Sequence, residues 1–302
     1  PGRVTVQGDT VMEKYSSISP MPGGGEVKVS IDRMSGATRM ENLDIANLGG
    51  LMRTAFTLGA ATKKGDDAAN AGKTAEQKSM ALAMLAQVAG LLDAMEAEYT
   101  YDGVAIDGGV FMGTLRQFGF GLALGADGGK AGMKLRLSAE GLESPMIPDG
   151  PIKEFVPHRL TLTPSIGGVP KDVLVAFLKR AIETDGDEMA GEGMALLAQN
   201  PVVVGLDDLL LDVGPMRLKG VGAVQVSSPE EIAGEAEIRA SGLDAMIRRV
   251  NTVPDFKGAA PVLIFLKGIG KQEGNETVWK IVYADKRLMV NDTDMSDLMP
   301  SR

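Results

Sequence analysis

YTYDGVAIDGGVFMGTLRQFGFGLAL, at residues 99–124, is the stretch of sequence that decides the fold. Apolar and polar residues alternate through much of it, and a period of two is typical of β-strands whose two faces meet different surroundings. A second long stretch, VVVGLDDLLLDVGPMRLKGVGAVQV, occupies residues 202–226. Such long strands, joined by tight Gly-containing turns, predict an extended, curved, antiparallel sheet.

The segments around these two stretches follow the same order, which indicates an internal repeat. Residues 25–146 and 154–246 each contain an alternating strand, a helix, a charged Gly-containing linker, a Met-Ala-Leu helix, long strands and a Gly-Leu element. A duplicated unit favours a scaffold whose surfaces carry the function. We therefore predict four segments: an N-terminal strand and loop (1–24), a first sheet-plus-helix repeat (25–150), a second repeat (151–256) and a C-terminal β-meander (257–302).

Periodicity assigns the remaining elements. Alternation predicts strands at Val4–Val11 and Glu26–Arg39, and apolar residues at three- and four-residue steps predict a helix over Thr74–Glu98, with Thr74 as its cap. Further predicted elements are a helix at Leu43–Thr57, strands at 99–112, 114–124 and 132–139, a helix from Pro170, strands near 201–212, 215–226 and 234–241, and a terminal hairpin or three-stranded meander built from 260–270, 276–285 and 287–292.

These elements predict an α+β protein with long, curved, mainly antiparallel sheets and two pseudo-repeated halves. Helices are expected to pack on one face of each sheet. The residues expected to be buried there are Met84, Val88, Leu92, Phe177 and Leu178.

Composition excludes several classes of function. The 302 residues carry a formal net charge of −9, which argues against a nucleic-acid partner because phosphates are neutralised by clustered Lys and Arg. Aromatic residues make up only 4% of the chain, too few for base-stacking platforms. There is no Cys, so disulfides, thiolate nucleophiles and cysteine metal sites are absent. No apolar run is long enough to span a bilayer as a helix, and Pro1 begins a strand-like segment, as a mature fragment would.

Residues that could carry chemistry are few, and we predict no catalytic residue, metal site or cofactor. The single histidine, His158, lies beside Pro157 at the start of a strand, and no nucleophile elbow accompanies it. Asp207 and Asp208 form an acid pair that could raise the pKa of one member, or they mark a turn or the exposed side of a strand. Two further acidic groups lack the spacing of a calcium loop: Asp185, Asp187 and Glu188, and Asp292, Asp294 and Asp297.

Methionine is the remaining feature, with 18 residues in the chain. Gap-filling in a core with few aromatic residues is the simpler interpretation, and the lining of an adaptable apolar cavity is the alternative. On the second interpretation, the candidate ligand-lining residues are Met52, Met84, Val88, Leu92, Phe177 and Met194.

Two segments resemble a known family. One is EGLESPMIPDGPIKEFVPHRLTLTPSIGGVPKDVL, in which a Gly-Leu strand end precedes prolines, a short strand and a Pro-initiated helix; the other is the ending GIGKQEGNETVWKIVYADKRLMVNDTDM. Together they resemble the alphaproteobacterial domain of unknown function 2125. The ending is also similar to AsmA-like envelope proteins and to the "unknown function 945" type. The resemblance implies a secreted or membrane-tethered envelope protein of a Gram-negative cell, built from long sheets, with no established catalytic residues.

The sequence therefore predicts a non-enzymatic protein, periplasmic or membrane-tethered and facing the periplasm, that binds or shelters an apolar ligand such as a lipid. An envelope scaffold that presents a sheet edge to another protein is one alternative. A hydrolase that uses Asp207 with Asp208, or the Asp185 group, is the other, and it requires the acids to converge in a concave site.

Overall fold

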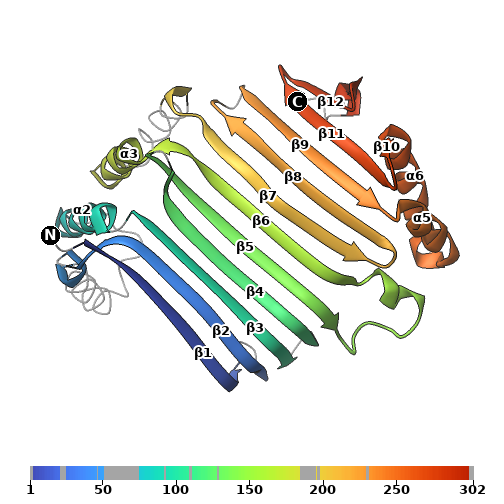
Figure 1. The fold of residues 1–302 in the computed structure, drawn as a ribbon, viewed down its shortest axis with the longest axis horizontal. Helices are drawn as coiled ribbons and strands as arrows, with labels where there is room; N and C mark the ends of the chain where they lie inside the picture. The colour runs from blue at the N-terminus through green and yellow to red at the C-terminus, as the bar shows by residue number, and fades with distance from the viewer. Residues whose placement is uncertain are drawn as a thin grey trace.

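The computed structural model describes residues 3–20, 25–45, 47–50, 75–91, 93–108, 111–127, 129–183, 195, 198–228 and 231–298. Its main element is one sheet in which every paired strand is antiparallel to its neighbour (Figure 1). The strands are β1 (Arg3–Pro20), β2 (Glu26–Asp44), β3 (Ala94–Gly108), β4 (Phe111–Asp127), β5 (Lys130–Glu143), β6 (Pro157–Pro170), β7 (Val202–Val213), β8 (Met216–Val226), β9 (Ile232–Ser241), β10 (Lys271–Glu273), β11 (Glu276–Ala284), β12 (Arg287–Val290) and β13 (Thr293–Asp294).

The spatial order of the strands follows the chain. Strands β1 to β9 are neighbours in sequence order, β11 pairs with β9, and β12, β13 and β10 complete the C-terminal edge. The predicted α+β class with long, curved, mainly antiparallel strands is confirmed, and a single continuous sheet runs through all four predicted segments. The order strand, helix, three strands occurs twice, as β2-α2-β3-β4-β5 and β6-α3-β7-β8-β9. The internal repeat itself stays a prediction, because it requires the two backbones to superimpose.

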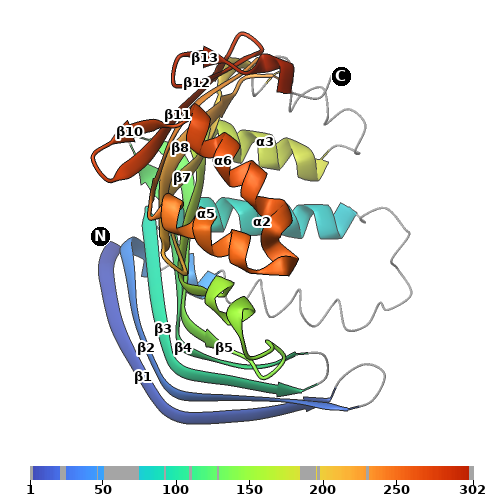
Figure 2. The same ribbon diagram turned by 90° about the vertical axis from the view of Figure 1, so that its right-hand side faces the viewer.

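The helices lie on one side of the sheet, as predicted (Figure 2). They are α2 (Ala75–Leu91), α3 (Lys171–Glu183), α5 (Leu243–Thr252) and α6 (Ala260–Ile269), with short 3₁₀ turns η1 (Pro151–Phe155), η2 (Pro254–Ala259) and η3 (Ser296–Leu298). Helices α2 and α3 pack against each other and touch the sheet near the ends of β2, β5 and β6. Helices α5 and α6 pack over the C-terminal strands, where the buried core lies; its members include Ala240, Leu243, Met246, Val250, Trp279 and Val290.

A bend crosses the N-terminal half of the sheet. Lys14 in β1, Gly103 in β3 and Gly141 in β5 have left-handed backbones, with φ of 55°, 62° and 67°. The three residues fall in one row across the sheet. The regular strand pairs lie on either side of this row, and Lys14, Gly103 and Gly141 are not among them. Left-handed residues and local breaks in pairing turn a strand. In Figure 2 the lower parts of β1 and β2 turn toward the side that carries the helices.

Two element predictions are wrong. The helix predicted over Thr74–Glu98 ends at Leu91, and β3 begins at Ala94, because pairing with β2 and β4 favours the extended conformation there. The segment 260–270, predicted as a strand, forms α6 up to Ile269; Pro261 lies in its first turn, where a proline fits a helix. The amphipathic helix α5 was not predicted. The helix predicted over Leu43–Thr57 extends beyond the described residues.

Candidate functional site: the apolar face of the sheet

One face of the sheet carries apolar residues in continuous rows that run across the strands. Strand register places these residues side by side, since paired residues in neighbouring strands point to the same face. The first row is Val6, Met40, Met95, Leu124, Met133, Ile166, Val204 and Val224. The second is Gly36, Tyr99, Phe120, Leu137, Leu162, Leu209, Gly220, Ile238 and Trp279. The third is Met12, Met34, Tyr101, Phe118, Ala139, Leu160, Leu211, Leu218 and Ala240.

These three rows, here called the apolar face, contain no charged residue. The face looks toward the helices, because the indole N–H of Trp279 donates a hydrogen bond of 2.8 Å to the backbone carbonyl of Leu266 in α6. The rings of Tyr101 and Phe118 lie next to each other, with centroids 5.9 Å apart. The sequence alternation in residues 99–124 therefore produces one apolar surface on the concave side of the sheet.

Much of the apolar face is accessible. At its C-terminal end Trp279 and Ala240 are buried beneath α5 and α6. Toward β3, β4 and β5, Tyr99, Phe120 and Leu137 are only half-buried. The first row is the most open, and its exposed members are Val6, Leu124, Met133, Ile166, Val204 and Val224. Soluble proteins rarely expose apolar rows of this extent unless they bind something.

A further apolar row lies below the bend, where the alternation of the strands changes phase. Above the bend the apolar residues of β3 include Tyr99 and Tyr101, and below it they are Val104 and Ile106, so the alternation shifts by one residue at Gly103. The same shift aligns a further apolar row, consisting of Tyr15, Ile31, Val104, Leu115 and Leu142. A one-residue shift of phase moves side chains to the other face of a strand.

Charged residues occupy the opposite surface, here called the polar face. One of its rows crosses eight strands and alternates in sign except at the neutral Gln117: Glu13, Arg33, Asp102, Gln117, Glu140, Arg159, Asp212 and Arg217. Arg159 pairs with Glu140 at 2.9 Å and Arg217 pairs with Asp212 at 2.6 Å. The hydrogen bond from Arg159 lowers the pKa of Glu140, and the one from Arg217 lowers the pKa of Asp212. Opposite charges across strands stabilise the register of the sheet.

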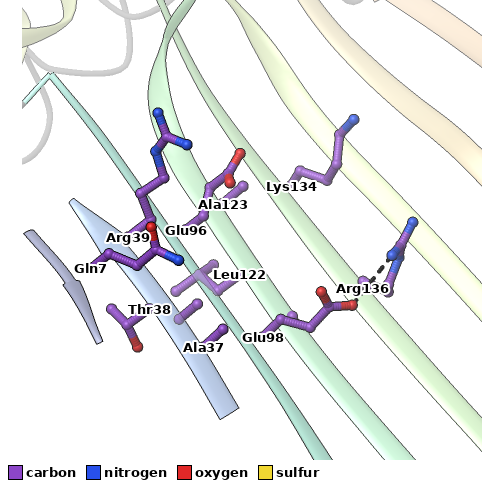
Figure 3. Close-up of a pocket in the computed structure, with 12 residues that line it drawn as sticks. Gln7, Ala37, Thr38, Arg39, Glu96, Glu98, Leu122, Ala123, Lys134 and Arg136 are labelled. Atoms are coloured by element: carbon purple, nitrogen blue, oxygen red, sulfur yellow. Dashed lines mark hydrogen bonds and ion pairs between the residues drawn. The ribbon is translucent and has the colours of Figure 1, made fainter. Parts of the chain in front are cut away.

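A shallow depression of about 370 Å³ lies on the polar face over β1 to β5 (Figure 3). Its floor is made of small residues such as Ala37, Gly121 and Ala123, and Figure 3 shows the longer polar side chains around them. The cations at its rim have acidic partners: Arg39 with Glu41, Lys134 with Asp207, and Arg136 with Glu98. Charges that are already paired leave little attraction for an anion, so the depression does not resemble a phosphate or carboxylate site.

The acid pair does not have the environment of a general acid. Asp207 is an extra residue in β7, since Pro164 pairs with Leu206 and Thr163 pairs with Asp208. Lys134 Nζ lies 2.5 Å from Asp207 Oδ2, and the Ser165 hydroxyl donates a hydrogen bond of 2.7 Å to Asp207 Oδ1. The hydrogen bond from Lys134 lowers the pKa of Asp207, which is opposite to the mutual elevation considered from the sequence. Asp207 therefore stays ionised near neutral pH and acts as an ion-pair partner.

The other candidate groups remain separate. His158 is exposed on β6, a strand with neighbours on both sides. Within the described ranges no three His, Asp or Glu side chains converge as metal ligands would. Asp294 accepts hydrogen bonds from Ser296, and the side-chain bond lowers its pKa. Asp185, Asp187 and Glu188 lie outside the described residues.

The ligand-lining residues predicted from the sequence are only partly described. Met84 in α2 and Phe177 in α3 are half-buried, while Met52, Leu92, Met194 and the side chain of Val88 lie outside the described residues. The prediction that Leu178 is buried is wrong, because 39% of it is exposed. The predicted lining residues lie mainly in helical segments, whereas the apolar face lies on strands. The alternation of Phe118, Phe120, Leu122 and Leu124 indicated an apolar side of one strand, but the rows across strands depend on register.

Comparisons with protein-family models, with curated proteins and with solved structures gave no match to this chain. The resemblance to the alphaproteobacterial domain of unknown function 2125 therefore stays a prediction. In the part of the chain that the structure describes, no helix has the length and apolar character needed to span a membrane.

Proposed function

We propose that this chain is a non-enzymatic envelope protein that holds the acyl chains of a lipid on its apolar face. The observation that carries the proposal is the segregation of charge across one sheet: three rows without a charged residue on the concave side, and alternating charges on the other. The apolar face needs no reactive side chain to do this, because acyl chains bind by removal of apolar surface from water. The envelope location rests on the family resemblance.

The dimensions of the apolar face suit acyl chains. From the row of Met95 to the row of Tyr101 the face extends roughly 20 Å along the strands, at about 3.3 Å per residue. From β1 to β8 it extends about 34 Å across the strands, at about 4.8 Å per spacing. The product is a footprint of the order of 700 Å², in which the first row is mostly exposed and most of the other two rows is half-buried. Aromatic and Met side chains there can adapt to flexible chains.

The test is to place a carboxylate on the apolar face and compare it with the same change on the polar face. Met133 (46% exposed) and Val221 (51% exposed) are both accessible, so neither change disturbs a buried core. Val221 points to the polar face, where it pairs with Glu237. We expect Met133→Glu to weaken binding of a fluorescent fatty acid at least tenfold, because a carboxylate must then be desolvated against the chain. We expect Val221→Glu to bind like the parent protein.

Lipid carried from the cell provides a second measurement. Protein purified without detergent from its own host should release lipid on solvent extraction, and native mass spectra should contain a ligand-bound species. Absence of lipid from both measurements, together with no binding of the fluorescent fatty acid, would contradict the proposal. Equal binding by the two Glu variants would show that the ligand does not use the apolar face.

The scaffold alternative has one supporting observation. Strand β1 is an 18-residue edge strand, nearly all of it exposed, and a partner strand could pair with its outer edge. However, β1 carries Arg3, Asp9, Glu13 and Lys14, and charges on an edge strand discourage such pairing. The edge therefore favours a protected sheet boundary, and the apolar face stays the preferred site.

A further inference from the structure

Helix α6 presents a second apolar surface, on the side of the helix that faces away from the sheet. Leu263 and Ile269 pack against the core around Trp279. Val262 and Phe265, three residues apart on the outer side, are 57% and 48% exposed, and Leu266, at the border with the core side, is 38% exposed. Ile264 is exposed on the flank of the same helix. Helix α6 has apolar residues on all sides, and exposure of its outer side to water is unfavourable in free energy.

The charge around α6 differs from that of the rest of the chain. Residues 242–271, which hold α5, η2 and α6, contain five cations and two acids, a net charge of +3, whereas the whole chain has a net charge of −9. The cations Arg248, Lys257 and Lys271 are exposed. Exposed apolar residues flanked by cations are typical of helices that lie in the interface of a bilayer with anionic lipids.

The position of α6 connects this surface to the apolar face. The hydrogen bond between Trp279 and Leu266 fixes α6 over the end of the second apolar row. Figure 2 shows α5 and α6 as an exposed helical pair at the front of the sheet, with neither helix enclosed by other described elements. Beyond α5 and α6 the second row continues through Leu209 and Leu162, which are only half-buried.

We infer that the outer side of α6 docks on the surface of a bilayer that contains anionic lipids, and that Val262, Phe265 and Leu266 enter the acyl boundary. This inference rests on the proposed function, since it names the source of the lipid that the apolar face holds. Lys257 and Lys271 then lie near the anionic headgroups and strengthen the attachment.

Vesicle flotation tests the inference with the full chain. Neutral vesicles contain phosphatidylcholine alone, and anionic vesicles contain phosphatidylcholine with about 30% phosphatidylglycerol. We expect the parent protein to float with the anionic vesicles and to bind the neutral ones at least fivefold more weakly. We expect Phe265→Asp to reduce the bound fraction at least tenfold, and the matched variant Val221→Asp, on the polar face, to leave it unchanged.

Several outcomes would overturn the inference. Phe265→Asp could float as well as the parent protein, or the parent protein could fail to float at all. A parent dimer that Phe265→Asp converts to monomer, without vesicle binding by either, would assign the surface to a second copy of the chain. Unchanged circular dichroism of Phe265→Asp ensures that the variant is folded, and Phe265→Ser repeats the test without a new charge.

Binding of the fluorescent fatty acid separates this inference from the proposed function. If the protein binds the fatty acid but does not float with vesicles, the docking inference fails and the proposed function stands. If the protein floats with vesicles but binds no fatty acid, the proposed function fails and α6 is a membrane contact with another purpose.

Discussion

Gly103 tests whether the bend in the sheet depends on a left-handed residue. Its φ of 62° is a conformation that costs an L-residue roughly 1–2 kcal/mol. A Cβ atom at Gly103 would also lie 2.6 Å from Cγ and 2.9 Å from Cβ of Asp32, so the Asp32 side chain must move. Displacing the Asp32 side chain about 30° from its rotamer, together with a small backbone shift, adds about 0.5–1.5 kcal/mol. Gly103→Ala should therefore lower the free energy of unfolding by about 1.5–3.5 kcal/mol.

Two other glycines separate these contributions. Gly129 has a φ of 81° but no heavy atom within 4 Å of a Cβ, so Gly129→Ala should cost only the conformational part, about 1–2 kcal/mol. Gly8 lies in β1 without a positive φ and with the same open space. Gly8→Ala should be neutral or stabilising by up to about 1 kcal/mol, because it lowers the entropy of the unfolded chain.

Urea and thermal unfolding, followed by circular dichroism, would measure this series. For a chain of this length 1 kcal/mol corresponds to about 2 °C in Tm, so Gly103→Ala should lower Tm by about 3–7 °C. If Gly103→Ala is as stable as Gly8→Ala, the bend does not require a left-handed backbone at Gly103. Equal losses for Gly103→Ala and Gly129→Ala would show that Asp32 yields without cost.

Two further predictions concern the C-terminal core and the polar face. Trp279→Phe loses one hydrogen bond and some packing, about 2 kcal/mol in total; the Leu266 carbonyl still accepts from Gly270 N at 3.1 Å and is not left unpaired. Hydrogen exchange in α6 should become about 30-fold faster, and unchanged exchange would contradict the packing described. On the polar face, the pKa of Asp212 is lowered in the folded state, mainly by Arg217, so its contribution to stability is present at neutral pH and is lost as pH falls through the folded-state pKa. The urea midpoint should change little from pH 7 to pH 5 and drop toward pH 3, and Arg217→Met should reduce that drop; a midpoint that is flat down to pH 3 would disagree.

The strands were the part of the fold that sequence could predict. The predicted strands at 99–112, 114–124 and 132–139 correspond to β3, β4 and β5, which extend further at most of their ends. Alternation identifies a strand, but pairing with both neighbours decides where it stops. Ala94 to Glu98 show the difference, because Met84, Leu91 and Met95 continue a helical spacing into residues that β2 and β4 hold in the sheet.

Helix α6 was mispredicted because its sequence has no polar face. In APVLIFLKGIG an apolar run fits a buried strand and a helix equally well, and only its length and Pro261 separate the two. The helix forms because Leu263 and Ile269 then reach the core around Trp279, and the Trp279 indole finds a carbonyl acceptor. This is a tertiary reason, and no local pattern contains it.

The apolar face was beyond local reasoning for a related cause, which is that a face exists only once register is known. Alternation in one strand defines two sides, but it does not say which side of the next strand lies beside it, and a slip of one residue would place Phe120 next to Glu98 instead of Tyr99. The cross-strand ion pairs on the polar face oppose such a slip, since they align only in the observed register. The ion pairs of the polar face thus help to fix the register that forms the apolar face. Exchanging Arg217 and Asp212 should preserve that register. Making both residues acidic should disturb the register and so weaken binding of the fatty acid, although both residues lie on the opposite face of the sheet.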